Sequence, residues 1–524
     1  MTAGRDEEKS SAPPSETPDV IIVDWDGPED SKNPYNWSSR KKWLNIMLAL
    51  VTTYTAQMNG TMITVAHDAI NSEFHVSDSS FPNSYWPVAS WTMGGVVFSL
   101  LILPIMEDFG IRRTFLITHF CLIIFIIPQA LARNFATLVV VRFFAGGCVA
   151  VLGNGSASII GNMFETEMAR TKPVAIWIVA YLGGSSSGPV VGASIFQFLS
   201  WRWISYLQLI WCGVLCVMNV LLLKETRGTV ILQRRARSLR AMGKNAYTRH
   251  ELQAEPISQV LLTSLRRPLK MLCTEYVVFF ATLWSAFTVG TLYLFTQSVE
   301  QVFVELYDWT PVQAGYVQAA IVIGEVCAWL FSSFSARLYF NSAKRNTEIP
   351  GVPIPEARLY LSIGGGIFGF AGGMFVYGWT SYPSLPWIAP AVGLWMVGLG
   401  SIVVVSGIAD YAVDAYSKYA GSAMACFVVG ENTVSAFLPL ATSSMYRTLG
   451  FQWASTLLAC ISLLLTLAPL SFIVWGRQIR QNSPFMAEAM LTKQAEIMHE
   501  ISSGSPREIR ERNPDTDNNM THVV

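Results

Sequence analysis

Three strongly ionisable residues lie well inside long apolar stretches of this 524-residue chain: Arg142, Glu325 and Glu431. A charge at the centre of a bilayer costs at least about 2.5 kcal/mol on insertion scales, so each should face protein or water rather than lipid. A carboxylate held away from water can take up a proton on one side of a membrane and release it on the other. The three residues therefore indicate a polar site inside a membrane protein.

Glu325 is the first candidate to carry a coupling proton or to bind a cationic substrate. Gln318 and Ser332 lie seven residues to either side of it, so the three should form one polar stripe along a helix. We expect that stripe to line a cavity. The alternative is a protonated carboxyl that hydrogen-bonds a neighbouring helix and has only a structural role.

Glu431 and Arg142 are the other charged candidates. Glu431 has Asn432 beside it and Ser435 one turn further on, and it could pair with a basic group or sense the charge of a substrate. Arg142 stays charged at any accessible pH, so it cannot carry the proton, but it can favour the ionised form of a carboxylate that does. Its long side chain could instead extend to lipid headgroups.

Polar residues on the first apolar segment are candidates for substrate contacts. Gln57 belongs to a face on which polar residues are spaced by four, four and three, and Asn59 lies close to it. Hydrogen bonding between helices is the alternative for both.

Composition indicates a membrane protein, because hydrophobic residues make up 52% of the chain, charged residues only 14%, and the mean hydropathy is +0.38. A bilayer core needs about 20 apolar residues per helix. We therefore predict an all-α membrane protein with twelve spans, near 43–64, 84–105, 114–133, 137–160, 173–197, 203–223, 276–298, 311–335, 357–379, 387–410, 420–444 and 453–475.

A polar, basic stretch separates the spans into six and six. We expect two six-helix bundles with a substrate site at the midplane between them. Lys and Arg concentrate in the even-numbered loops, which predicts cytoplasmic termini. The tails are poor in apolar residues and are expected to be disordered. The predicted parts are a cytoplasmic tail at 1–42, a bundle at 43–223, a cytoplasmic central loop at 224–275, a bundle at 276–479 and a cytoplasmic tail at 480–524.

The stretch YLGGSSSGPVVGASIF, residues 181–196, is unusual for a membrane span. Gly184, Gly188 and Gly192 are spaced by four, so they stack on one helix face and allow another backbone to approach closely. Pro189 removes a backbone hydrogen bond and bends the helix. Such a helix suits a bundle that rocks, and plain packing is the alternative.

A second motif, LPIMEDFGIRR at 103–113, lies between the second and third spans. Its glycine permits a tight turn, and its two arginines could bridge acidic residues when the cytoplasmic mouth of a transporter is shut. Two aspartates near the end of the tenth span flank the same mouth. The candidate cytoplasmic gate comprises Glu107, Gly110, Arg112, Arg113, Asp410 and Asp414.

These motifs resemble those of the major facilitator superfamily. GSSSGPVVGA is similar to its antiporter motif, LPIMEDFGIRR to its cytoplasmic loop motif, and RFFAG at 142–146 to its third motif. NPYNWSSRKKW, WRW and YAVDAYSKYAGSAMA are similar to stretches of fungal twelve-span drug:proton antiporters. One departure is Glu431, which stands where many of those relatives carry arginine.

The resemblance implies the major facilitator fold and alternating access. It also implies proton-coupled export of drugs, toxins or secondary metabolites across the plasma membrane. Proton-coupled uptake of a polyamine or a small organic acid would use the same scaffold, and a non-transporting nutrient sensor is a third hypothesis. The sequence has no HExxH, GxSxG or GxxxxGK[ST] motif, so an enzyme is disfavoured.

The expected partners are a small-molecule substrate, protons and the lipid bilayer. A net charge of zero gives no support for nucleic-acid binding. The eight cysteines lie singly, so we expect neither a disulfide nor a metal site, and no cofactor is implied. The fold can work as a monomer, which is the expected state. The basic segment 234–249 could contact anionic lipid or could act only as an orientation signal.

Overall fold

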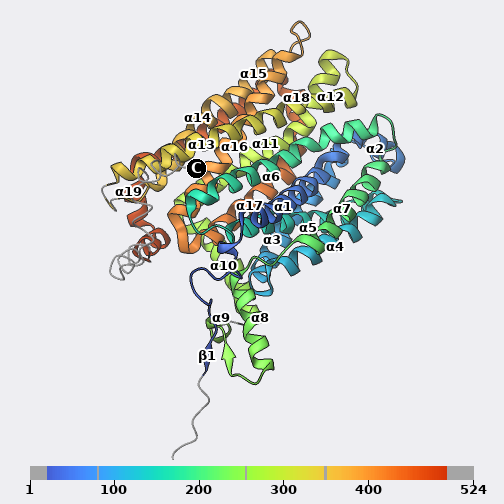
Figure 1. Ribbon diagram of the computed structural model, residues 1–524. Helices are drawn as coiled ribbons and strands as arrows, with labels where there is room; N and C mark the ends of the chain where they lie inside the picture. The colour runs from blue at the N-terminus through green and yellow to red at the C-terminus, as the bar shows by residue number, and fades with distance from the viewer. Residues whose placement is uncertain (1–19, 79–81, 254–255, 347, 349–350, 493–524) are drawn as a thin grey trace, which may run out of the picture.

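The computed structural model describes residues 20–78, 82–253, 256–346, 348 and 351–492 (Figure 1). Helices dominate, and they form two bundles that follow one another along the chain. The first half contains α1 (Ser39–Thr61), η2 (Met62–Ala66), α2 (His67–Phe74), η3 (Asn83–Tyr85), α3 (Trp86–Phe109), α4 (Ile111–Ala130), α5 (Phe135–Gly161), α6 (Glu167–Phe196) and α7 (Arg202–Leu222).

The second half has the same order of long spans, with more breaks in its helices. It contains α11 (Tyr276–Tyr307), α12 (Pro311–Val317), α13 (Ala319–Ser342), η4 (Ala343–Arg345), η5 (Pro355–Arg358), α14 (Leu359–Gly364), the π-helical turn η6 (Gly365–Ala371), α15 (Gly372–Thr380), α16 (Ile388–Tyr416), η7 (Ser417–Tyr419), α17 (Ala420–Phe437), η8 (Leu438–Ala441), α18 (Thr442–Leu449) and α19 (Phe451–Asn482).

Ten stretches of helix in the described chain are long and apolar enough to cross a membrane. One of them, Ile388–Leu449, holds two spans, α16 and α17, separated by η7. α1, which begins with a basic turn, supplies the remaining span. The prediction of twelve spans in two bundles is therefore confirmed.

The bundle has two opposite ends. The terminal side is the end at which Ser39 begins α1 and Asn482 ends α19. The far side is the opposite end, where α2, α12 and α18 lie (Figure 1).

Glycines set the closest helix crossings, and they do so in the same way in each half. A Cβ atom on Gly146 of α5 would lie 2.0 Å from the carbonyl oxygen of Trp91 in α3. A Cβ atom on Gly324 of α13 would lie 2.1 Å from the carbonyl oxygen of Trp395 in α16. Neither position has room for a side chain, so backbone packs directly on backbone at both crossings.

The two halves meet along two pairs of helices, α3 with α17 and α6 with α13. On the far side, the hydroxyl of Tyr85 donates a hydrogen bond to the carbonyl of Ser435 at 3.2 Å. The hydroxyl of Tyr316 donates to Oε1 of Gln197 at 2.8 Å. The interface therefore combines packed helix faces with polar contacts.

The central loop and the described part of the N-terminal tail form a small structured unit (Figure 1). The loop contains α8 (Gly228–Ala241), β2 (Ala246–Tyr247), α9 (Arg249–Leu252) and α10 (Ile257–Thr274), and the tail contains β1 (Ile21–Ile22) and η1 (Pro34–Asn36). β1 pairs in parallel with β2, and Arg235 forms an ion pair with Asp30 at 3.6 Å. Backbone N–H groups of Lys32 and Asp26 lower the pKa of Asp30, and the charge of Arg235 lowers it further.

The disorder expected for both tails is therefore not observed in their described parts. Residues 20–38 are held by pairing with a loop more than 200 residues away, a contact that composition cannot reveal. Residues 484–492 are helical, with Met486 buried and Lys418 bonded to Glu488 at 2.7 Å. That hydrogen bond lowers the pKa of Glu488. Residues 1–19 and 493–524 lie outside the described chain.

Candidate functional site

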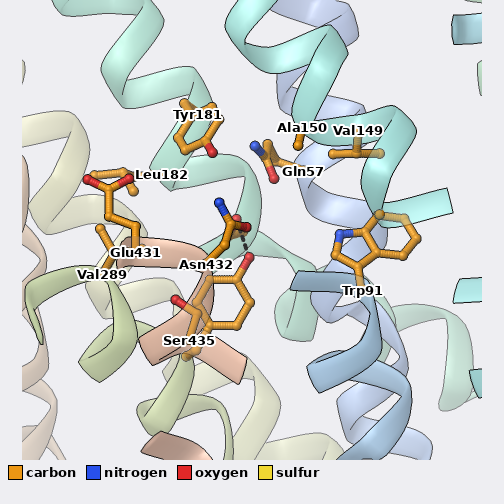
Figure 2. Close-up of a pocket in the computed structure, with 13 residues that line it drawn as sticks. Gln57, Trp91, Val149, Ala150, Tyr181, Leu182, Val289, Glu431, Asn432 and Ser435 are labelled. Carbon is orange, nitrogen blue, oxygen red and sulfur yellow. Dashed lines mark hydrogen bonds between the residues drawn. The ribbon is translucent and has the colours of Figure 1, made fainter. Parts of the chain in front are cut away.

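A small cavity lies between the two halves, at the middle of the bundle (Figure 2). Its volume of about 20 Å³ is room for about one water molecule. Its walls include Gln57, Trp91 and Tyr181 from the first half and Tyr293, Glu431 and Asn432 from the second. Both halves supply polar groups, but the cavity is so small that it can bind a molecule larger than water only when the halves stand further apart.

Glu431 is one of two carboxylates at this depth. Its side chain is almost fully buried on α17 and accepts a hydrogen bond from the hydroxyl of Ser285 on α11. Tyr181, Gln57 and Asn432 line the same cavity, and Figure 2 shows these three side chains around one space. The structure brings Gln57, Glu431 and Asn432 together around one cavity.

Glu325 is the second carboxylate, and it lies at the contact between α6 and α13. It is completely buried, and the hydroxyl of Ser186 on α6 donates to its Oε1 at 2.7 Å. Its Oε2 has no hydrogen-bond partner and would lie 3.3 Å from a Cβ atom on Gly183. A carboxylate of the second half is therefore held by the glycine-rich helix of the first half.

The polar stripe expected along α13 is spread over too great a length to line one cavity. Gln318 is buried at the start of the helix, whereas Ser332 lines a separate crevice near the terminal side. Fourteen residues of α-helix span about 21 Å, so residues on one face can still be far apart along the axis. Of the three, only Glu325 lies at the middle of the contact between the halves.

Asn59 does not face the central cavity. Its Nδ2 lies 3.5 Å from Sγ of Cys212, and its backbone carbonyl accepts from Gln208 at 3.3 Å, both on α7. The expectation that Asn59 contacts substrate is therefore not supported. Asn59 instead takes part in contacts between α1 and α7 of the first half, which was the alternative.

Arg142 is fully buried in the first half and is held by backbone oxygens. Its guanidinium donates to the carbonyls of Pro87, at 2.7 Å, and Gly60, and it stacks on Trp91 at 4.6 Å from the ring centre. Its Nη1 has no hydrogen-bond partner, and no ion pair joins it to a carboxylate within the described residues. Arg142 therefore ties α5 to α1 and α3, and it does not extend to headgroups.

The glycine face of α6 packs on α1, as its spacing predicts. Cβ atoms on Gly184 and Gly192 would lie 2.6 Å from the carbonyl oxygen of Tyr54 and 2.2 Å from that of Met62. At Gly188 the nearest atom, Oγ1 of Thr61, would be only 2.0 Å away. Pro189 lies inside the same helix. One face of α6 thus fits its own half closely, while Gly183 and Ser186 turn towards the other half.

The residues expected to form one cytoplasmic gate belong to two separate networks. Gly110 makes the turn between α3 and α4 at a φ of 101°, and Arg112 donates to the carbonyls of Leu223, at 2.6 Å, and Val220, at 2.8 Å. Its backbone N–H also donates to Glu225 at 3.2 Å. All of these contacts stay within the first half and the start of the central loop.

In the second half, Asp414 and Asp410 pair with Arg358 at 2.9 and 3.4 Å. The expected bridge from Arg112 and Arg113 to the two aspartates is therefore not formed among the described residues: Arg112 is bonded within its own half, and the aspartates pair with Arg358. The side chain of Glu107 lies outside the described residues.

A much larger cavity, of about 570 Å³, lies on the far side between α2 and α11. We call it the far-side vestibule. Its titratable lining is His67, Asp68, Asp78, Tyr85, Glu300, Glu305 and Arg447. Burial by itself lowers the pKa of His67, but the negative charges of Glu300 and Asp68 outweigh it, so the pKa is raised.

The sequence matches one known protein family over most of its length. The family model of the Major Facilitator Superfamily matches residues 47–425. The chain belongs to this superfamily. It is therefore a multi-pass transporter of small molecules rather than an enzyme.

This superfamily member has fungal relatives of similar length. It is 30% identical over 472 residues to the MFS-type transporter penM of Penicillium rubens, which covers 89% of this chain and 91% of the relative. It is 29% identical over 481 residues to the efflux pump radE of Floropilus chiversii, covering 91% and 88% of the two chains. Among solved structures, the xylose transporter XylE from E. coli has a TM-score of 0.57 at 17% identity, with 82% and 99% covered. That likeness shows the fold alone.

Several residues of the transporter's centre were not expected from the sequence. Trp91 and Tyr181 line the central cavity, and Ser186 and Ser285 bind the two carboxylates. The only signal for Ser186 was the motif GSSSG, in which the glycines predict close packing but the serines carry no separate meaning. Single hydroxyls on apolar helices usually bond their own backbone, so spacing cannot identify those that face a carboxylate.

Proposed function

We propose that this transporter exports small organic molecules in exchange for protons. The observation that carries the proposal is the burial of Glu325 of the second half against Ser186 of the first half, with one carboxylate oxygen unpaired. A carboxylate at such a contact loses its partner and meets water when the two halves separate. It can therefore gain or lose a proton in step with the motion that moves the substrate.

Glu431 is proposed to act at the substrate side of the same centre. It lines the cavity, whereas Glu325 lies beside it in the helix contact. Gln57, Tyr181 and Asn432 complete a polar surface that would orient a bound molecule. Trp91 and Tyr293 add aromatic area for an apolar cargo.

The direction of transport is proposed from two independent supports. The glycine face of α6, with Gly188 directly on Thr61, has the features of the antiporter motif. The efflux pump among the relatives matches over most of both chains. With the terminal side in the cytoplasm and the chain in the plasma membrane, the far-side vestibule is where cargo leaves.

The test uses vesicles that contain the purified full-length protein, a panel of labelled compounds and a pH gradient of either sign. We expect substrate to move against the direction of proton flow. Glu325→Gln should lower gradient-driven transport at least about tenfold while exchange without a gradient persists. Glu431→Gln, the matched variant, should change the apparent affinity for substrate more than the dependence on the gradient. Undiminished gradient dependence in Glu325→Gln would remove this residue from the proton path, and movement along the proton flow would indicate uptake.

A further inference from the structure

A cluster of metal-ligating groups spans the two halves at the far-side vestibule. His67 and Asp68 begin α2 in the first half, and Glu300 lies on α11 in the second. Nε2 of His67 is 3.2 Å from Oδ1 of Asp68, and Nδ1 of His67 is 3.6 Å from Oε1 of Glu300. One ligand atom from each residue can be chosen so that all three lie within 4.8 Å of one another.

We propose that His67, Asp68 and Glu300 bind a divalent transition-metal ion of the Zn²⁺ class and thereby clamp the two halves together on the far side. An imidazole with two carboxylates is a ligand set that Zn²⁺ accepts, with bonds of about 2.0–2.2 Å and a water in the fourth position. Two donors on one such ion lie about 3–3.5 Å apart. Nε2 of His67 and Oδ1 of Asp68 are already at that separation, 3.2 Å.

The imidazole is oriented for this role. Nδ1 of His67 lies 3.0 Å from the carbonyl oxygen of Thr64. Since a carbonyl can only accept, Nδ1 carries the proton, and Nε2, which faces Asp68, is the nitrogen that binds the ion in exchange for any proton it holds. The Glu300 side chain is long and rotatable, so its carboxylate can swing to the same ion, and the vestibule leaves room for water.

The surrounding charges favour a cation. Asp78 and Glu305 line the same vestibule, and Arg447 is the one arginine or lysine among its described lining residues. A concave surface with an excess of carboxylates raises the local concentration of cations. Glu300 has only 15% of its side chain exposed, so its charge is screened less than that of a surface group.

A bound ion would act on the motion of the halves because its ligands come from both. A ligand that binds one arrangement better than another shifts the population towards that arrangement. A metal ion held at the spacing seen here therefore favours this arrangement of the far side and slows its exchange with the others. This consequence for transport rests on the proposed function, whereas the binding of the ion does not.

The test begins with binding to purified full-length protein, measured by isothermal titration calorimetry with ZnCl₂ at pH 7.5. The exposed Cys273 and Cys460 are alkylated first, so that thiols do not compete. We expect one saturable site. His67→Ala and Glu300→Gln should each weaken it at least about tenfold. Glu305→Gln, which removes a vestibule carboxylate outside the cluster, should weaken it by no more than about twofold. Absence of a saturable site, or equal affinity in Glu300→Gln, would refute a site shared between the halves.

A gain-of-function variant guards against variants that simply misfold. Glu300→His replaces one ligand by another, so it should restore Zn²⁺ affinity relative to Glu300→Gln and add Ni²⁺ binding. Zn²⁺ applied from the far side should then slow transport by the parent protein and by Glu300→His, but not by Glu300→Gln. If Glu300→His binds no better than Glu300→Gln, Glu300 is not a ligand. If the ion binds without slowing transport, the clamp is refuted even where the metal site stands.

Discussion

The two halves contribute opposite charges to the centre, and they hold them differently. Arg142 of the first half bonds the carbonyls of Pro87 and Gly60 in its own half. Glu325 of the second half has a single hydroxyl partner, Ser186, and that partner belongs to the other half. A group tied to its own backbone keeps its place when the halves move, whereas a group tied across the interface changes its surroundings. The cation is therefore part of the scaffold, and the carboxylate is part of the moving contact.

Replacement of Arg142 should have the largest effect, because it removes the buried guanidinium of the first half. Arg142→Ala leaves two buried carbonyls without their donors and opens a cavity beside Trp91, so we expect a loss of stability of about 3 kcal/mol or more. The measurement is thermal unfolding of the purified protein. Arg142→Lys is the control, since it keeps the charge but offers no planar group for both carbonyls, and it should be intermediate. A stable Arg142→Ala protein that fails only in transport would mean that Arg142 acts in proton coupling or substrate binding and is not only part of the scaffold.

A second prediction concerns the glycine face of α6, which packs on α1. Gly188→Val places a side chain where Oγ1 of Thr61 would be 2.0 Å from the Cβ, so α6 and α1 must separate, at a cost of about 1–3 kcal/mol and with little transport left. Gly213→Val on α7 is the matched control, because nothing lies within 4 Å of the added atom. Transport and thermal unfolding are measured on both. Similar behaviour of the two variants would show that the glycine contact is not required.

Replacement of Ser186, the hydroxyl partner of Glu325 across the interface, should have the smallest effect on transport. Ser186→Ala removes the one hydrogen bond that the described residues make to Oε1 of Glu325, which is worth about 1 kcal/mol, or about fivefold in gradient-driven transport. Ser194→Ala is the control on the same helix, because the hydroxyl of Ser194 is exposed and donates to the carbonyl of Val190 in its own helix. Substrate affinity should stay constant in both. A change in affinity without a change in gradient dependence would place Ser186 in the substrate site.

The sequence predicts the scaffold well because its signals are local. Apolar runs of membrane-spanning length give the twelve spans, and the spacing of Gly184, Gly188 and Gly192 predicts the close contact that α6 makes with α1. Both features depend on residues that lie near one another in the chain. The same reasoning finds Glu325 and Glu431, since a charge inside an apolar run is conspicuous at any position.

The sequence cannot predict which polar groups meet. Asn59 and Gln57 lie two residues apart, yet one faces α7 and the other faces the central cavity. Asp410 and Asp414 pair with Arg358 of their own half, and Arg112 of the loop motif bonds a carbonyl of its own half. His67 and Glu300 are more than 200 residues apart, so the absence of a metal motif in the sequence says nothing about their proximity.

The backbone contacts of Gly146 with Trp91 and of Gly324 with Trp395 limit how this protein can move. Where main chain rests on main chain there is no side chain to rotate out of the way, so neither crossing can bend or slide in small steps. Each half should travel as a solid piece. A passage can then open only at the two contacts between the halves, where α3 meets α17 and α6 meets α13. Glu325 lies in the second of these contacts, so its surroundings change whenever the halves turn against each other.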